Sequence, residues 1–474
     1  MSIVFFDCEA TGLHPAFDQM VQWAAIRTDN DLREIDRFEV RSRLLPYVIP
    51  APGALRVTGL TIDDLLSPEH PTYYEMVCRV REVLAGWCPS AFIGFNSIRF
   101  DEEFLRQAFY QNLHPPYLTN TGGSRRADAL ALVQTAAVLH PNSLAVPLND
   151  KGRPVFKLDR LAPANGFDHA NAHDALADVE ATIFICRLVK ARCPDVWARF
   201  LRFATKGNVA GFVYDADAFV LVEPSRHTAH VVAALGDNPG NQNVVYCWNL
   251  RADPRPFAEM NDEDLAKALV RSGSPVRRLK KNAAPSICPL DEAPAHILEP
   301  ESAELLARRG RWVARDRAFV TRIIGTMVAA EPQYPPSPHV ERQIYDGFWS
   351  GADSNRLQAF HTADWRDRVR IAEELEDARL SWLARRIVWV ERPDLCPEHH
   401  AGEFARLKAQ RLLASKEECG GWNTLTKVAS ELEDMMPDLP PDWTTAFSKL
   451  RDYIERRRVE CEHVVSARNA RQAT

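Results

Sequence analysis

The pattern of apolar and polar positions in the first 200 residues predicts a mixed α/β domain. Short apolar or alternating runs, which are typical of β-strands, lie at residues 3–6, 22–28, 38–44 and 91–96. Apolar positions at helical spacing lie at residues 73–87, 101–112, 127–139 and 173–192. We expect the strands to form one central mixed sheet with helices packed against it.

A different pattern begins near residue 204, where short apolar runs are separated by Gly, Pro, Asn and Asp. Antiparallel strands of a small β-barrel or sandwich are predicted at residues 218–225, 227–235, 241–250 and 275–282. One helix is expected at residues 261–272. From about residue 300 helical spacing dominates, with clear runs at residues 301–328 and 365–389. A chain of 474 residues is expected to form roughly two to four domains.

The composition is that of an ordinary folded protein, with 46% hydrophobic and 26% charged residues. No apolar run approaches the roughly 20 residues of a membrane span, and the N-terminus lacks the features of a signal peptide. We therefore expect a cytoplasmic protein with no membrane partner. The net charge of −6 does not exclude a nucleic-acid partner, because phosphate binding depends on where the basic groups lie.

The ten cysteines include no CxxC pair, so reduced and mostly buried thiols are expected. Cys396, followed by His399 and His400, comes nearest to a cluster of zinc ligands. No second cysteine pair completes this cluster, and we do not expect zinc there.

The stretch IVFFDCE ends an apolar strand in two carboxylates. Side chains alternate along a strand, so Asp7 and Glu9 point to one side of the sheet and Cys8 to the other. Two anions in so small a space are costly unless a cation lies between them. The start of the chain therefore indicates a metal site.

Three more residues form a constellation with this pair. Asp101 lies just past the strand at residues 91–96, and Asp178 follows His173 by five residues. Asp174 is placed to cap the helix that carries Asp178 in its first turn. Each feature alone has an ordinary explanation: a chance Asp-x-Glu, a helix-start acid, a solvated helix face and a loop histidine. Their order and flanking residues together favour one shared site.

Four carboxylates suit the hydrolysis of a phosphodiester. Two divalent ions about 3.5–4 Å apart activate a water molecule and stabilise the charge on phosphorus and on the departing oxygen. Mg²⁺ and Mn²⁺ prefer oxygen ligands, so carboxylates are the required residue type. His173, neutral near pH 7, is suited to take the proton from the attacking water.

The same residues resemble a known group of nucleases. Asp7-Cys8-Glu9, Asp101 and His173-x4-Asp178 resemble the three exonuclease motifs of the DEDDh group. Longer stretches are similar to the bacterial exodeoxyribonuclease I family, at residues 52–61, 94–112, 164–182 and 343–353. The resemblance implies a general base at His173 and two Mg²⁺ ions, replaceable by Mn²⁺. It places the metal ligands at Asp7, Glu9, Asp101 and Asp178.

One departure from the family lies beside the first motif. The family usually has Thr directly after the motif Glu, whereas this chain has Ala10 there and Thr11 one position later. A hydroxyl contact to the end of the substrate is therefore in question, although backbone groups are able to replace it.

The resemblance also implies three domains arranged as a C-shaped channel around single-stranded DNA. These are a ribonuclease-H-like nuclease domain at residues 1–203, an SH3-like β domain with helical insertions at 204–342, and an α-helical domain at 343–474 that closes the channel. The implied activity is 3′→5′ removal of 5′-mononucleotides from single-stranded DNA, in DNA repair and recombination.

Several basic and aromatic residues are candidates for holding the strand. Those beside Asp101 are Asn96, Arg99 and Phe100, although core packing explains Phe100 equally well. Arg125 and Arg126 precede a predicted helix and are either phosphate contacts or solvated side chains. A predicted strand carries the densest basic cluster, for which a charged edge strand is the alternative. Its members are Arg277, Arg278, Lys280 and Lys281.

Two other functions fit the same residues. An RNA-trimming exonuclease would use the same acids, and an inactive relative would act as a single-strand-binding adaptor. The resemblance further implies a monomer that binds the acidic tail of single-stranded DNA-binding protein. Gln134 falls where the docking pocket would be expected to offer Arg.

Overall fold

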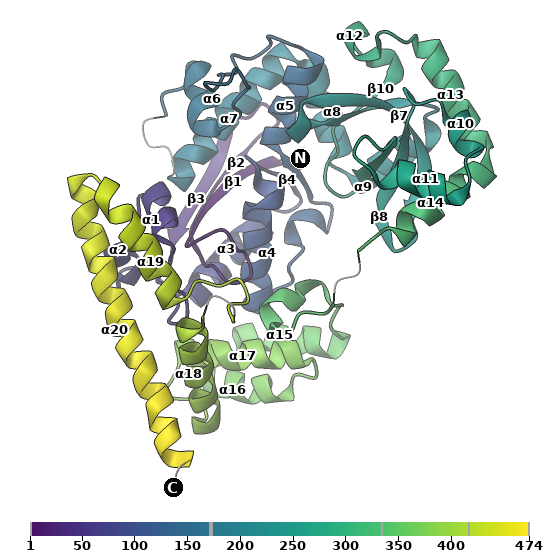
Figure 1. Cartoon of the computed structure of the whole chain (residues 1–474). Helices are drawn as coiled ribbons and strands as arrows, with labels where there is room; N and C mark the ends of the chain where they lie inside the picture. Colours follow the sequence, from purple (N-terminus) through teal and green to yellow (C-terminus); the bar gives the residue numbers. More distant parts are fainter. Residues whose placement is uncertain (1, 170–173, 333–334, 416–417, 473–474) are drawn as a thin grey trace.

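A five-stranded mixed sheet forms the centre of the first part of the chain, in the order β3-β2-β1-β4-β5 (Figure 1). The strands are β1 Ser2–Ala10, β2 Met20–Thr28, β3 Glu34–Arg41, β4 Ser90–Gly94 and β5 Arg125–Asp128. Strands β1, β2 and β3 are antiparallel neighbours, whereas β4 and β5 run parallel to β1. The computed structural model describes all residues except 1, 170–173, 333–334, 416–417 and 473–474. The predicted central mixed sheet is confirmed.

Both faces of this sheet are buried, because β1 is apolar on both sides. Ile3 and Phe5 pack with the helices α5 Ala129–Leu139 and α7 Ala175–Arg192. Val4 and Phe6 pack on the other face against α3 Tyr73–Trp87 and α4 Asp101–Gln111. The two apolar layers fix the strand register, and they set the side on which Asp7 and Glu9 emerge.

The remaining helices of this part lie between the strands or after β5 in the sequence. They are α1 Pro52–Thr58, α2 Ile62–Leu66, η1 Ser97–Arg99, η2 Leu118–Asn120, α6 Leu158–Ala164, α8 Pro194–Phe203 and α9 Lys206–Asp215. The apolar pattern did not predict β5 or α9. The strand β5 has the sequence RRAD, in which Arg126 is buried because it forms an ion pair with Glu102 at 3.1 Å.

A second five-stranded sheet, entirely antiparallel, follows in the order β10-β6-β7-β8-β9. Its strands are β6 Phe219–Glu223, β7 Thr228–Asn238, β8 Asn241–Asn249, β9 Val276–Lys280 and β10 Ile287–Pro289. The helices and turns around it are η3 Pro224–Arg226, α10 Pro254–Ala258, α11 Asp262–Val270, η4 Leu290–Glu292, α12 Ala295–Leu298, α13 Ala303–Arg315 and α14 Arg317–Ala329. The helical run predicted at 301–328 is two helices, because Asp316 interrupts it and caps α14 by accepting from the Phe319 amide.

The last part of the chain is helical and packs against the first sheet domain. Its elements are η5 Val340–Tyr345, α15 Gly351–Thr362, α16 Trp365–Glu374, α17 Ala378–Glu391, α18 Glu398–Leu413, α19 Leu425–Met435, η6 Met436–Asp438 and α20 Pro441–Gln472. Val21 of β2 shares an apolar cluster with Leu425 of α19, and Tyr74 of α3 shares another with Leu383 of α17. None of the described helices has the length and apolarity to cross a bilayer.

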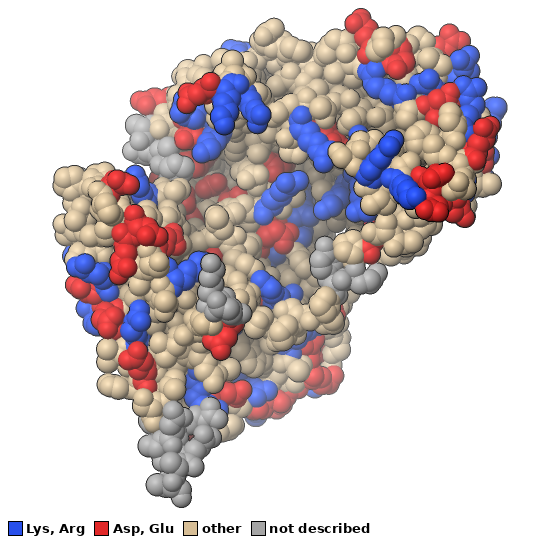
Figure 2. Space-filling model, viewed as in Figure 1, with Lys and Arg blue, Asp and Glu red and all other residues tan. Residues whose placement is uncertain are grey.

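The three parts surround a hollow face. In Figure 1 the second sheet lies to the right of the first, helices α15–α18 lie below the first sheet, and α19 and α20 lie on its left. Figure 2 shows that the surface between them is recessed and carries both Lys or Arg and Asp or Glu side chains. A recess lined with basic side chains is suited to binding an extended, negatively charged polymer.

A buried ion-pair cluster connects the C-terminal helices to one another. Glu341 is 2% exposed and accepts from Arg386 of α17 at 3.0 Å and from Arg411 of α18 at 2.9 Å. Burial alone would raise the pKa of Glu341, but the two guanidinium groups outweigh it and lower the pKa. Arg386 also donates to Gln111 Oε1 of α4 at 2.8 Å. This cluster therefore joins the helical part to the first domain.

Glu341→Ala is expected to lower the free energy of unfolding by about 3–5 kcal/mol, because it leaves two largely buried guanidinium groups unpaired. Urea denaturation of the full chain measures the change. Glu374→Ala, which removes an exposed partner of Arg370, is the matched control and should cost under about 1 kcal/mol. Equal effects of the two substitutions would show that the cluster adds no stability.

Candidate active site

Four carboxylates from three separate elements converge at one end of the first sheet. Asp7 and Glu9 lie on β1, Asp101 is the first residue of α4, and Asp178 lies in the first turn of α7. Carboxylate oxygens of Asp7, Glu9 and Asp178 lie within 4.8 Å of one another. Asp101 Oδ1 accepts from the Cys8 amide at 3.0 Å, which places it beside the same segment of β1. The expected juxtaposition of the four acids is present.

Burial of this cluster opposes its ionisation. Glu9 is 8% exposed and Asp101 is 3% exposed. Burial, followed by repulsion from Asp178 and Asp101, raises the pKa of Glu9 to about 9. Burial also raises the pKa of Asp101 to about 7, and burial with repulsion from Asp101 and Glu9 raises that of Asp7 well above its ordinary value. Divalent cations would relieve this repulsion, so the residues present fit a metal centre built from oxygen ligands.

The acid at the start of α7 has the capping role that the sequence predicts. Asp174 accepts from the Ala177 amide at 3.3 Å. Its other oxygen accepts from Gln22 of β2 and from Arg41 of β3, each at 3.1 Å. These contacts hold the N-terminus of α7 against the sheet, and they thereby position Asp178.

A histidine that the sequence analysis did not single out contacts this site. His169 Nε2 lies 2.9 Å from Asp178 Oδ1. The expected general base, His173, lies outside the described residues. The segment FDHANAHD contains both histidines, and only His173 has the motif spacing to Asp178. In the sequence, His169 is therefore indicated by its position in the same short segment as His173.

The hydroxyl next to the first motif does not reach the site. Thr11 is 1% exposed, and its Oγ1 accepts from the Gln19 amide at 2.9 Å. This hydroxyl therefore stabilises the turn after β1. It does not replace the threonine that the family usually has at the position of Ala10.

The candidate strand-binding residues next to Asp101 differ in exposure. Asn96 has a left-handed backbone with φ of 61°, and its amide donates to Asp128 Oδ1 at 2.9 Å. Asn96 and Arg99 are exposed, whereas Phe100 is half-buried with its ring 4.8 Å from that of Phe104. Phe100 therefore contributes to the core. Arg125 is half-buried on β5, the edge strand of the first sheet.

The basic cluster around the edge strand β9 does not form one exposed face. Arg277 pairs with Glu223 at 3.3 Å, and Arg278 is exposed but pairs with Glu331 at 3.4 Å. Lys280 is exposed. Lys281 follows the strand, is 5% exposed and binds Asp237 Oδ1 at 2.6 Å. Alternate members of the cluster, Arg278 and Lys280, are therefore exposed together, whereas Lys281 is buried because it pairs with an acid on β7.

A mixed sheet that gathers buried carboxylates at the end of its central strand defines a metal-dependent phosphodiesterase. Residues 4–186 match the family model described as Exonuclease, and residues 338–457 match the Exonuclease I C-terminal domain. Exodeoxyribonuclease I of Escherichia coli strain K12 is 31% identical over 406 residues, which cover 81% of this chain and 84% of that protein. The chain belongs to the exodeoxyribonuclease I family.

Solved structures agree with this assignment. E. coli Exonuclease I in complex with a dA16 oligonucleotide superposes with a TM-score of 0.83 at 25% identity, covering 96% of this chain and 99% of that one. A structure titled as SSB/Exonuclease I in complex with inhibitor CFAM has a TM-score of 0.81 at 24% identity, with the same coverage of both chains. The fold therefore extends over all three parts of the chain.

The metal-free protein is expected to lose stability as the pH rises from about 4, where these acids ionise in the unfolded chain, to about 9. The pKa values of Asp101, about 7, and Glu9, about 9, are raised in the folded state, so the stability that their protons provide is lost as these groups ionise. Thermal unfolding in EDTA and in Mg²⁺ measures the effect, which Mg²⁺ should reduce. Glu9→Gln should flatten the EDTA profile. Identical slopes in EDTA and Mg²⁺ would contradict the assignment of these acids to a metal.

Proposed function

We propose that the chain is a divalent-metal-dependent 3′→5′ exonuclease that degrades single-stranded DNA to 5′-mononucleotides. The observation that carries the proposal is the convergence of Asp7, Glu9 and Asp178 oxygens within 4.8 Å, with Asp101 beside them. Membership of the exodeoxyribonuclease I family supports the choice of DNA and of the 3′ end.

In the proposed mechanism Asp7, Glu9, Asp101 and Asp178 would hold two Mg²⁺ ions, for which Mn²⁺ could substitute. Such ions would activate water and offset the charge that develops on phosphorus and on the leaving oxygen. His173 accepts the proton of the attacking water. Gln22 and Arg41 act through Asp174, because they fix the helix terminus from which Asp178 projects.

We assign strand binding to residues near the carboxylates and on the second sheet. Asn96, Arg99 and Phe100 are proposed to contact the terminal nucleotides, and Arg125 the phosphates nearby. In the second sheet, Arg278 and Lys280 are the exposed members of the basic cluster, so they are assigned direct contact. Arg277 and Lys281 are assigned a supporting role through their ion pairs with Glu223 and Asp237.

The domain boundaries are proposed as residues 1–203 for the nuclease domain, 204–342 for an SH3-like domain and 343–474 for the helical domain that closes the channel. We place the protein in the cytoplasm as a monomer acting in DNA repair and recombination. Its proposed partner is the C-terminal tail of single-stranded DNA-binding protein. Gln134 is 9% exposed on α5, so other side chains would have to provide the basic contact.

Cleavage of matched 5′-labelled DNA and RNA oligonucleotides in Mg²⁺ tests this function. Stepwise shortening of DNA from the 3′ end, with little loss of RNA, is the expected result. Faster loss of RNA would favour the RNA-trimming alternative, because the same acids serve either sugar. Tight binding of DNA without any cleavage would identify an inactive adaptor. A 3′-terminal block that leaves the rate unchanged would contradict the direction.

A further inference from the structure

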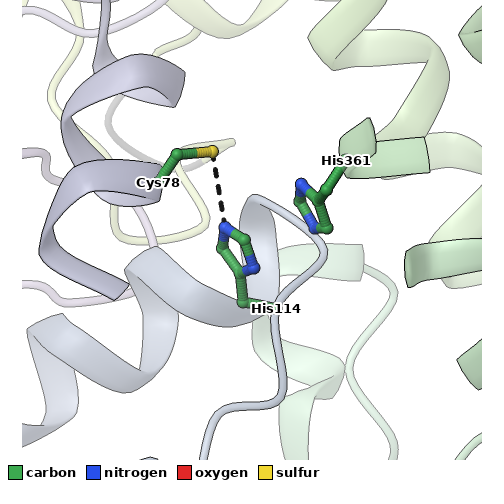
Figure 3. A group of neighbouring side chains, drawn as sticks. All are labelled: Cys78, His114 and His361. Carbon is green, nitrogen blue, oxygen red and sulfur yellow. Dashed lines mark hydrogen bonds between the residues drawn. The ribbon is translucent and has the colours of Figure 1, made fainter. Parts of the chain in front are cut away.

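A second cluster of metal-ligating side chains lies away from the nuclease carboxylates, where the first domain meets the C-terminal helices. Figure 3 shows Cys78 of α3, His114 after α4 and His361 of α15 directed toward one another. Their ligand atoms lie within 4.8 Å of one another. Cys78 Sγ and His114 Nε2 are 3.5 Å apart. Three segments far apart in the sequence thus bring one sulfur and two imidazoles together.

Local structure holds each of these side chains in place. Tyr74 and Cys78 are four residues apart on α3, so they share one helix face. Leu113 has a φ of 67°, which reverses the chain after α4 and directs His114 toward that face. The rings of His114 and His361 stack with centroids 3.9 Å apart at 8°. The apolar cluster around them includes Tyr74 and Leu113, so the site is well supported.

Hydrogen bonds determine the protonation of His361. Its Nε2 lies 3.2 Å from the Leu113 carbonyl, so Nε2 carries the proton and donates it. Its Nδ1 is therefore unprotonated, and accepts from the Tyr74 hydroxyl at 2.9 Å. Metal-binding histidines are commonly fixed in this way, with one ring nitrogen donating to a backbone carbonyl and the other facing the ion.

The surroundings keep both imidazoles neutral. Burial, aided by His361, lowers the pKa of His114 to about 2, and burial lowers the pKa of His361 to about 4. Burial raises the pKa of Cys78 to about 11, so without a metal it is a thiol. Neutral imidazole and thiolate are the ligands that Zn²⁺ prefers, in contrast to the carboxylates of the nuclease site.

The sulfur and nitrogen are already spaced for tetrahedral zinc. Bond lengths of about 2.3 Å to sulfur and 2.0 Å to nitrogen place these two ligands about 3.5 Å apart, the distance between Cys78 Sγ and His114 Nε2. The ligand atoms of the whole cluster span up to 4.8 Å, so His361 has to rotate toward the other two. That rotation releases its hydrogen bond from Tyr74.

We propose that Cys78, His114 and His361 bind one Zn²⁺ ion that joins the nuclease domain to the C-terminal helices. Zn²⁺ binds the sulfur as the Cys78 thiol loses its proton to solvent, and the two neutral imidazoles supply the other ligands. Cys78 and His361 are half-buried, which leaves a path for the ion. The site is independent of the nuclease reaction, because none of its ligands comes from the carboxylate cluster.

Cobalt provides the spectroscopic test. The full-length protein is stripped with EDTA under reducing conditions, exchanged into chelator-free buffer and titrated with Co²⁺. We expect a thiolate-to-cobalt charge-transfer band that saturates at one equivalent and disappears when Zn²⁺ is added. The nuclease carboxylates contribute no such band. Cys78→Ser should abolish it, whereas Cys396→Ser, which removes another half-buried thiol, should leave it intact.

Thermal unfolding provides a second readout. Zn²⁺ is expected to raise the unfolding temperature of the wild type and of Cys396→Ser, because it binds only the folded site. With Mg²⁺ present throughout to occupy the nuclease carboxylates, Cys78→Ser and His361→Gln should bind Zn²⁺ at this cluster at least about 100-fold more weakly and show a clearly smaller shift than the wild type. Metal-free unfolding curves establish that both variants fold. The proposal would be overturned if the charge-transfer band survived in Cys78→Ser or if the wild type showed no band. Cys78, His114 and His361 would then form only a hydrogen-bonded packing contact.

Discussion

Asp7→Asn is expected to reduce the rate of 3′-end cleavage about a thousandfold and to leave the affinity for single-stranded DNA within about threefold. Metal ions contribute several kcal/mol of charge stabilisation to phosphoryl hydrolysis, and each 1.36 kcal/mol is tenfold in rate. Asp7 belongs to the cluster, because its carboxylate oxygen lies within 4.8 Å of those of Glu9 and Asp178. Losing its charge removes a ligand without disturbing the basic side chains that hold phosphate.

The measurement pairs single-turnover cleavage in Mg²⁺ with DNA binding in Ca²⁺. Asp31 is an exposed acid in the turn between β2 and β3. Asp31→Asn is therefore the matched control and should cleave DNA like the wild type. Because Asp7→Asn also removes one of several repelling buried anions, the variant should unfold at a higher temperature than the wild type in EDTA. A variant that loses cleavage and DNA binding in equal measure would indicate that Asp7 is structural.

His173→Ala is expected to slow cleavage by about 10²–10⁴-fold, the usual contribution of a positioned general base. Mn²⁺ binding, followed by calorimetry, should remain close to that of the wild type, because the four carboxylates are unchanged. The residual rate should rise more steeply with pH than the wild-type rate, since hydroxide has to replace the missing base. His399→Ala, at an exposed histidine of α18, is the control. Loss of Mn²⁺ binding in His173→Ala would contradict the assignment of a base.

The sequence predicted those helices and strands in which apolar residues recur at regular helical or strand spacing. The helix expected at 73–87 is α3, and the strands expected at 22–28 and 38–44 overlap β2 and β3. The strand β5 was missed because two of its three buried residues are charged: Arg126 forms an ion pair with Glu102, and Asp128 accepts from the Asn96 amide. The spacing of apolar residues predicts which positions are buried in an apolar core. It does not predict charged residues that are buried because they are paired.

The two candidate metal sites differ in how much of them the sequence could indicate. Asp7 and Glu9 share one strand, and the acid motifs keep a fixed order, so the carboxylates were recognisable from their spacing. The ligands Cys78, His114 and His361 have no such spacing, because three elements from two domains bring them together. The sequence drew attention instead to Cys396 and His400, yet His400 Nε2 contacts Glu373 at 2.8 Å.

Shared apolar packing has a consequence for the exchange of parts of this chain. Val21 and Leu425 belong to one cluster and Tyr74 and Leu383 to another, so residues far apart in the sequence form each interface. The second sheet is joined to the first in the same way, since Ile3 and Val220 share a cluster. A chimaera that takes only its C-terminal helices from a distant relative would pair apolar surfaces of different shape, and it is therefore expected to be less stable than either parent.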